Sequence, residues 1–290
     1  MLLPYEFHRA PKSWGYQLQN VDPLYLRNTA FDVLVVDVDD VPLEAVQSLK
    51  YKADGERRDV LSYISIGEAE GYRDYWKEVR ADAMPNWLLD VNPEWNDNWV
   101  VKFWDRDYQR HIFKQLDKII KAGYDGAYFD KCDAPHDILR WHRTAARPIA
   151  EMQRAMIAFI LKLSVYARAK NPAFRVVMQN AEDLLSPDLQ DGSAMLVQTL
   201  SGVAKEDLIL GAEEDGMPNH PDLVRWSNDM LGRVTHAGKP VFVVEYTDWN
   251  GVDLADLLRD LRDFGYVPYI ARPDRALDEM VVAKITGGSF

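Results

Sequence analysis

Apolar runs of the length of a buried strand recur along the chain, and each run ends in a polar or acidic residue. Their interiors, such as VLVVDV, VLSYISI, GAYF, RVVM and VFVV, are almost continuously apolar. This pattern is typical of parallel strands that are buried on both faces of a sheet. It predicts eight strands, at residues 13–18, 32–39, 59–68, 125–133, 175–182, 194–200, 240–245 and 266–272.

Helix patterns lie between these runs. Residues 108–121 place five apolar side chains on one stripe, and Gly123 follows as a stop signal. Pro148 opens a second helix that Asn171-Pro172 closes, and a third helix covers residues 254–264. Alternation of strand and helix indicates an α/β protein, and eight repeats favour a closed (β/α)8 TIM barrel over an open doubly wound sheet. No G-x-G-x-x-G follows a strand, which also argues against a dinucleotide-binding fold.

The length of 290 residues fits one such barrel or two average domains. Because no linker or low-complexity segment interrupts the chain, we expect a single barrel domain over residues 1–290. Residues 85–105, PNWLLDVNPEWNDNWVVKFWD, are too many for a compact connection. They predict a tryptophan-rich loop insertion after the third strand, carrying a short helix or strand.

Composition and charge narrow the class of partner. Hydrophobic residues make up 47% and charged residues 28%, the balance of a globular protein, and no apolar run is long enough to cross a membrane. The net charge of −12 and the lack of a basic block argue against a nucleic-acid partner and favour a neutral or cationic one. Cys132 is the only cysteine, so no internal disulfide forms. We expect a secreted or periplasmic location if a signal peptide was removed, with the cytoplasm as the alternative.

Acidic residues gather at the predicted strand ends, which in a barrel meet at one mouth. An Asp at a strand end also often caps the next helix, and this structural role is the alternative for each of these acids. The acids are Asp37, Asp39, Glu68, Asp130, Asp133, Glu182, Glu206 and Glu245, and beside them stand Tyr63, Ser65, Gln179, Asn180, Tyr246 and Arg272.

Clustered carboxylates indicate either metal binding or acid–base chemistry. No histidine falls at a predicted strand end and no HExxH pair occurs, so we expect no metal and no other cofactor, with an all-oxygen Mg²⁺ or Ca²⁺ site as the alternative. Hydrolysis of a glycosidic bond needs two carboxyl groups that flank it. Tryptophans in or near the predicted loops either stack on sugar rings or pack into the core. They are Trp87, Trp95, Trp99, Trp104 and Trp249.

Several phrases of the sequence resemble one enzyme family. SYISIGEAEGYRDYW, AGYDGAYFDKCD, MQNAEDLL, SGVAKEDLI and VVEYTD are similar to those of the glycoside hydrolases of family 114, related to endo-α-1,4-polygalactosaminidases, from about Trp14 to Arg272. The resemblance implies a TIM barrel that cleaves within chains of α-1,4-linked galactosamine, a polysaccharide that is cationic when deacetylated. It also implies Asp130 as nucleophile or charge stabiliser and Glu206 as proton donor, with Glu213 or Glu214 as the alternative to Glu206.

The remaining polar residues of the predicted mouth are expected to bind the sugar. Two other functions stay open on the same fold, a carbohydrate-binding barrel without turnover in polysaccharide export or modification, and a metal-dependent lyase or aldolase. The expected substrate-binding residues are Asp37, Asp39, Tyr63, Ser65, Glu68, Asp105, Lys131, Asp133, Gln179, Asn180, Glu245, Tyr246 and Arg272.

Overall fold

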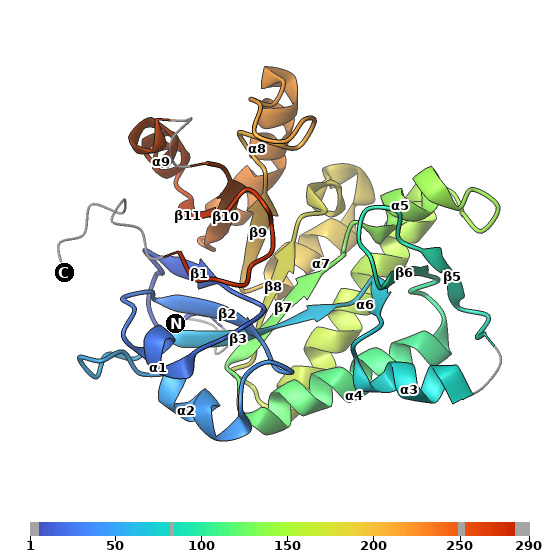
Figure 1. The fold of residues 1–290 in the computed structure, drawn as a ribbon. Helices are drawn as coiled ribbons and strands as arrows, with labels where there is room; N and C mark the ends of the chain where they lie inside the picture. The colour runs from blue at the N-terminus through green and yellow to red at the C-terminus, as the bar shows by residue number, and fades with distance from the viewer. Residues whose placement is uncertain (1–5, 82–83, 249–252, 282–290) are drawn as a thin grey trace.

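The structure, a computed structural model, describes residues 6–81, 84–248 and 253–281. Within these ranges, eight parallel strands form a nearly closed barrel with helices around it (Figure 1). Their order in the sheet follows the order of the chain, as in a TIM barrel. The strands are β1 (Trp14–Tyr16), β2 (Val33–Asp37), β3 (Asp59–Ser65), β7 (Gly126–Asp130), β8 (Arg175–Gln179), β9 (Gly202–Glu206), β10 (Val241–Tyr246) and β11 (Val267–Ala271).

Aromatic side chains fill the inside of the barrel where its first and last strands meet. The Trp14 indole on β1 donates a hydrogen bond to the Val267 carbonyl on β11 over 3.0 Å. The Tyr16 ring packs against two other rings, with its centroid 5.7 Å from that of Trp14 and 5.2 Å from that of Tyr128. These buried rings form a floor beneath the carboxyl ends of the strands.

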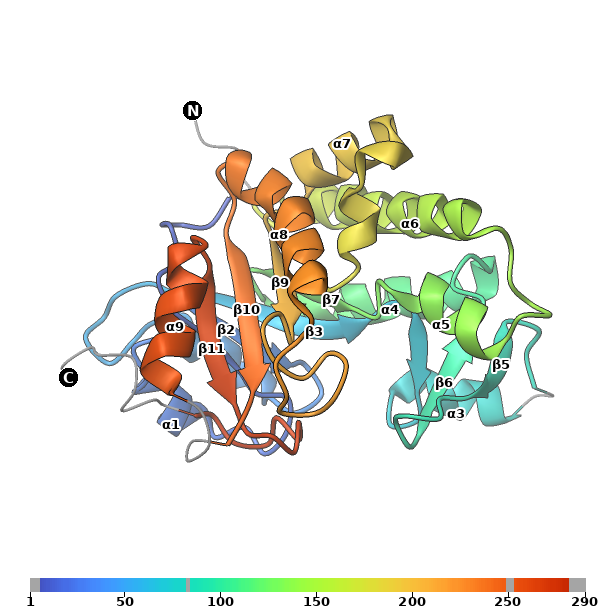
Figure 2. The ribbon, with the colours of Figure 1, turned by 90° about the horizontal axis from the view of Figure 1, so that it is seen from above.

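The helices cover the outside of the barrel, and the three helices expected from the sequence are all present (Figure 2). The left-handed conformation of Gly123, with φ of 84°, ends the helix that precedes β7. The α-helices are α1 (Pro23–Arg27), α2 (Val46–Leu49), α3 (Asp74–Ala81), α4 (Arg106–Ala122), α5 (Ala134–Trp141), α6 (Ile149–Lys170), α7 (Asp191–Thr199), α8 (Pro221–His236) and α9 (Leu254–Asp263), and the 3-10 helices are η1 (Leu43–Ala45), η2 (Glu182–Leu185) and η3 (Pro187–Leu189).

One predicted strand is wrong. Residues 194–199 belong to helix α7, Leu200 is its C-cap, and the sixth barrel strand is β9. In α7 Leu196 and Val197 are buried, whereas the preceding Met195 is exposed, as on a helix with one face against the barrel. The strand β9 is harder to recognise in the sequence, because it contains the charged residue Lys205. In the folded protein Lys205 forms an ion pair with Glu182 at 3.3 Å.

The insertion after β3 folds into a small antiparallel sheet rather than an open loop. Its strands β4 (Glu68–Glu70), β5 (Leu88–Val91) and β6 (Asn98–Val101) pair in the order β4-β6-β5. The Trp99 ring packs 4.1 Å from Trp76 of α3, and the buried Trp87 ring lies 5.3 Å from Tyr108 of α4. Figures 1 and 2 show β5 and β6 at one side of the barrel, next to α3 and α5. Glu68, predicted to end a barrel strand, therefore begins this second sheet.

Candidate active site

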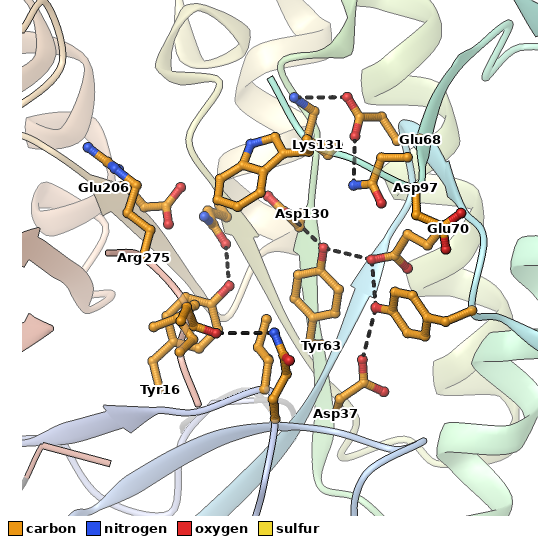
Figure 3. A pocket seen from close by; sticks show the side chains of 18 of the residues that line it. Tyr16, Asp37, Tyr63, Glu68, Glu70, Asp97, Asp130, Lys131, Glu206 and Arg275 are labelled. Carbon is orange, nitrogen blue, oxygen red and sulfur yellow. Dashed lines mark hydrogen bonds and ion pairs between the residues drawn. The ribbon is translucent and has the colours of Figure 1, made fainter. Parts of the chain in front are cut away.

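A pocket of about 680 Å³ opens at the carboxyl ends of the barrel strands. The barrel supplies one wall and the small sheet with its connections supplies the other (Figure 3). Ten carboxylates line the pocket, against two basic residues, Lys131 and Arg275. The acids are Asp37, Asp39, Asp40, Glu68, Glu70, Glu94, Asp97, Asp130, Asp133 and Glu206.

Asp130 ends β7 and faces this pocket. Its Oδ2 atom lies 2.9 Å from the hydroxyl group of Tyr63 on β3. Desolvation, followed by the charge of Glu206, raises the pKa of Asp130 to about 8, and the ammonium group of Lys131 offsets part of this effect. The Asp130 carboxyl group therefore keeps its proton to a higher pH than an ordinary aspartate does.

Glu206 ends β9 and is held from both neighbouring strands. Tyr246 of β10 donates to its Oε1 atom over 2.5 Å, and the Asn180 amide that follows β8 donates to its Oε2 atom over 3.0 Å. The guanidinium group of Arg275 lies 4.5 Å above the Tyr246 ring. Burial, and then the charges of Glu206 and Asp130, raise the pKa of Tyr128 in the floor. The charges of both carboxyl groups thus act on the same buried tyrosine.

Lys131 connects the end of β7 to the small sheet. Its ammonium group lies 3.1 Å from Glu68 Oε1 and 2.7 Å from Asp137 of α5. The Asn92 amide also donates to Glu68 Oε1, over 2.6 Å. Burial raises the pKa of Glu68 to about 6, and the charge of Lys131 opposes this. The ion pair between Lys131 and Glu68 therefore connects the two walls of the pocket.

The backbone turns sharply at three neighbouring strand ends. Lys131, Asn180 and Asp207, the first residues after β7, β8 and β9, have φ values of 57°, 54° and 55°. Such left-handed conformations cost residues with side chains about 1 kcal/mol or more each. Gly67 approaches the first of these turns so closely that a Cβ atom on it would lie 2.0 Å from the Lys131 carbonyl oxygen. The local backbone is therefore strained where the carboxylates are presented.

Comparison with known proteins assigns the family. The sequence profile of glycoside-hydrolase family GH114 matches residues 4–286. The chain belongs to glycoside-hydrolase family GH114. It is 36% identical over 282 residues to an uncharacterized protein of Methanocaldococcus jannaschii, covering 92% of this chain and 77% of that protein. An uncharacterized protein of Thermotoga maritima is 32% identical over 283 residues, covering 94% of this chain and 84% of that protein. The family resemblance of the sequence is confirmed.

Solved structures share the fold of this GH114 chain. The glycoside hydrolase domain of PelA from Pseudomonas aeruginosa matches with a TM-score of 0.71 at 22% identity, over 93% of this chain and 97% of that chain. Ega3 of Aspergillus fumigatus, in a complex with galactosamine, matches with a TM-score of 0.68 at 15% identity, over 91% and 92%. The predicted (β/α)8 barrel is thereby confirmed.

Most of the site residues predicted for this GH114 chain do lie in one pocket. They come from the ends of six strands, from the turns that follow, and from the start of the small sheet. These residues are Asp37, Asp39, Tyr63, Glu68, Asp130, Lys131, Asp133, Gln179, Asn180, Glu206 and Tyr246.

Ser65 and Asp105 do not line the pocket. Each instead forms a hydrogen bond with a backbone group nearby in the chain. The buried Ser65 hydroxyl donates to the Glu68 carbonyl over 3.3 Å. Asp105 is the N-cap of α4 and accepts a hydrogen bond from the Asp107 amide over 2.8 Å. For Asp105 the helix-capping alternative is the one that the structure shows.

Glu245 also lies outside the pocket lining, because side chains alternate along a strand. Tyr246 points into the barrel mouth, so the preceding Glu245 points outward, where it is completely buried. Its oxygens accept hydrogen bonds from the amides of Ile209 and Leu210 over 2.8 and 3.1 Å. Burial nevertheless raises the pKa of Glu245 to about 7. Glu245 thus anchors the chain that follows β9.

Arg275 lines the pocket, whereas the predicted Arg272 does not. Arg272 forms an ion pair with Glu279 at 3.3 Å outside the lining. Arg275, three residues later, lines the pocket and reaches Asp207 with both terminal nitrogens, at 2.7 and 3.1 Å. The strand-end pattern did not indicate Arg275, because the segment after β11 folds back over the mouth.

The alternative acids for the sixth strand, Glu213 and Glu214, are exposed and do not line the pocket. Glu213 instead accepts a hydrogen bond from the His220 amide over 2.6 Å. Among the tryptophans considered above, Trp95 lines the pocket, and Trp249 lies outside the described residues.

Glu70 and Tyr72 are lining residues that strand-end reasoning missed. Both belong to the phrase GEAEGYRDYW, which the family resemblance had already singled out, and Arg73 of the same phrase holds Asp37 and Asp39 at 2.7 and 2.5 Å. In residues 6–81, 84–248 and 253–281, no group of three or more His, Cys, Asp or Glu side chains is arranged to hold a metal ion. No helix of that part is long and apolar enough to cross a membrane.

Proposed function

We propose that this protein hydrolyses an amino-sugar polysaccharide, with α-1,4-linked galactosamine as the substrate and cleavage within the chain. The observation that carries the proposal is the pair Asp130 and Glu206, which reach one pocket from the ends of β7 and β9. Hydrolysis of a glycosidic bond uses two such carboxyl groups. Membership of family GH114 and the fold shared with Ega3, whose structure contains galactosamine, support the same chemistry.

The charge of the pocket supports a cationic substrate. Ten carboxylates surround a space with two basic side chains, and the whole chain carries a net charge of −12. A deacetylated galactosamine polymer carries one ammonium group per sugar, so the pocket raises its local concentration. The exposed Trp95 ring at the rim offers an apolar face to a sugar.

We assign proton donation to Glu206 and the role of nucleophile or charge stabiliser to Asp130. Burial and the charge of Glu206 raise the pKa of Asp130 to about 8, so Asp130 holds the proton that the reacting pair needs. A bound ammonium group lowers that pKa again, so a cationic sugar favours release of this proton within the pocket.

A substrate panel tests the proposal. The purified protein is incubated with a deacetylated galactosamine polymer, its N-acetylated form, a glucosamine polymer and a neutral glucan, and released oligosaccharides are measured by mass spectrometry. We expect oligosaccharides from the deacetylated galactosamine polymer. Binding of that polymer without any release would contradict the proposal and indicate the carbohydrate-binding alternative.

A substrate with a good leaving group, such as a galactosaminyl fluoride, tests the two roles separately, because its departure needs no proton. Glu206→Gln is expected to retain turnover of this substrate while losing turnover of the polymer, whereas Asp130→Asn loses both. The exposed Glu214→Gln is the matched control and retains both activities. The opposite pattern in the two site variants would reverse the assignment.

A further inference from the structure

A buried chain of hydrogen bonds leads from Asp130 to the small sheet (Figure 3). The Tyr63 hydroxyl lies 2.9 Å from Asp130 Oδ2 and 3.1 Å from Glu70 Oε1. Glu70 and Tyr63 are only 3% and 6% exposed. A single hydroxyl group therefore connects a proposed reacting carboxyl group to a carboxyl group that the proposed mechanism does not use.

Besides Tyr63, two side chains donate hydrogen bonds to the Glu70 carboxyl group. The guanidinium Nε of Arg73 donates to Glu70 Oε2 over 2.8 Å, and the Tyr72 hydroxyl donates to Glu70 Oε1 over 2.8 Å. Arg73 is buried beside it and also pairs with Asp37. Because an arginine stays charged in proteins, Glu70 keeps a permanent cationic partner.

The number of protons on these groups limits which of them can donate a hydrogen bond. The Tyr63 hydroxyl carries one proton, but it makes two close contacts with carboxyl oxygens, and each contact needs one proton. Glu70 already accepts from Arg73 and Tyr72, so it does not supply the second proton. A proton on Asp130 would satisfy both contacts, with Asp130 donating to Tyr63 and Tyr63 donating to Glu70.

We propose that Glu70 is a positioning residue for Asp130: held by Arg73, it takes the Tyr63 hydroxyl proton and so presents the Tyr63 oxygen to Asp130 as an acceptor. This inference rests on the proposed function, in which Asp130 belongs to the reacting pair. The raised pKa of Asp130 is consistent with this arrangement. The chain keeps Asp130 neutral and fixed in orientation until a cationic sugar arrives.

Other charged and titratable groups face the two ends of this chain. Asp130 is faced by Tyr16 of β1, Tyr63 of β3, Tyr128 of β7, Lys131, Cys132 and Asp133 after β7, and Glu206 of β9. Glu70 is faced by Asp37 of β2, Tyr63 of β3, Tyr72, Arg73 and Tyr75 before and in α3, and Tyr108 of α4.

Carboxyl ¹³C NMR as a function of pH tests the inference on the intact protein without any need for turnover. The Asp130 signal is assigned by its absence from Asp130→Asn. Glu70→Gln keeps the shape of the side chain but removes its charge, and we expect the titration midpoint of Asp130 to fall by about 1 to 2 pH units. The charge alone contributes about 0.5 units through space, at about 6 Å and an effective dielectric constant of about 80, and the rest comes from the loss of the Tyr63 oxygen as an oriented acceptor.

The variant Tyr63→Phe shows whether Glu70 acts through Tyr63. Alone it removes the acceptor of the Asp130 proton, so we expect a lower midpoint here also, and this variant keeps the pairing of Glu70 with Arg73 if Glu70→Gln fails to fold. Added to Tyr63→Phe, Glu70→Gln is expected to cause less than half of its original shift. Asp125→Asn is the matched control, a buried ion-paired carboxyl group outside the pocket, and it leaves the midpoint unchanged.

An unchanged midpoint in Glu70→Gln, or an equal shift with and without Tyr63, would overturn the inference. Failure of the proposed function looks different, because then the wild-type protein cleaves no polymer whatever the midpoint. If the polymer is cleaved, the alkaline limb of the kcat/KM profile of Glu70→Gln moves to lower pH together with the NMR midpoint, because loss of the Asp130 proton leaves the reacting pair without a proton to donate. A loss of activity through misfolding would lower kcat/KM without moving that limb.

Discussion

Replacement of Asp130 by Asn is expected to stabilise the fold while it abolishes the proposed activity. The folded protein raises the pKa of Asp130 from its ordinary value of 3.8 to about 8. Between these two values the folded state holds a proton that the unfolded chain has released. The free energy of unfolding therefore falls as the pH rises from about 4 to about 8. Asn does not ionise, and its amide group still donates to Tyr63, so the variant avoids this loss.

The size of the effect follows from the shift. A shift of this size corresponds to about 6 kcal/mol if Asp130 titrated alone in a closed site. The pocket is open to water, which weakens these electrostatic effects, so we expect about half of this, about 3 kcal/mol, at pH 8. For a chain of this length that raises the melting temperature by about 5 °C.

Urea unfolding of the wild-type protein and of Asp130→Asn at pH 4, 6 and 8 measures this directly. The two proteins are expected to have similar unfolding free energies at pH 4 and to diverge as the pH rises. Asp125→Asn, which removes ion pairs of 2.6 Å with Arg57 and 3.0 Å with Lys50, is the control and is expected to be destabilised. A destabilised Asp130→Asn at pH 8, or a difference that does not depend on pH, would refute the reasoning.

Three further substitutions probe how the pocket is built. Gly67→Ala places a Cβ atom 2.0 Å from the Lys131 carbonyl oxygen, so it displaces the end of β7 and is expected to lower kcat/KM by about 100-fold. Tyr246→Phe removes the 2.5 Å hydrogen bond to Glu206 and is expected to lower kcat/KM by about 10- to 100-fold. Trp95→Ala removes an exposed ring at the rim and is expected to raise KM by about 10-fold with an unchanged melting temperature.

Matched controls separate these effects from general damage. A Cβ atom on Gly192 in α7 would make an ordinary van der Waals contact, 3.7 Å from its nearest neighbour, so Gly192→Ala is expected to keep full activity. Trp226 is exposed like Trp95 but does not line the pocket, so Trp226→Ala leaves KM unchanged. Equal losses in a site variant and its control would disprove the structural reason given for that variant.

The barrel could be predicted from the sequence because a parallel strand buried on both faces is almost continuously apolar. The strand β9 is the exception, because it contains the charged residue Lys205. Glu182 neutralises this charge only once the chain has folded. The neighbouring apolar residues 194–200 fit the strand pattern better, although residues 194–199 form a helix. A buried ion pair between distant residues leaves no periodic signal in the sequence.

The site residues that end barrel strands could be predicted from the sequence, whereas those that come from other segments could not. Asp130 and Glu206 end barrel strands, so the rule that strand ends meet at one mouth brings them together. Glu70 comes from the small sheet and Arg275 from the segment after β11, and their positions depend on how these segments fold back over the mouth. Glu245 is predicted to bind the sugar but lies outside the pocket, since side chains alternate along β10 and that of Glu245 points away from the pocket.

A double-mutant cycle on the deacetylated galactosamine polymer tests the central claim, that Asp130 and Glu206 act as one pair. Reducing ends are measured for the wild-type protein, Asp130→Asn, Glu206→Gln and the double variant. Residues that act as a unit are not additive, so both single variants and the double variant are expected to fall to the same residual rate. A single variant with wild-type turnover, or a double variant whose loss is the product of the two single losses, would contradict the claim.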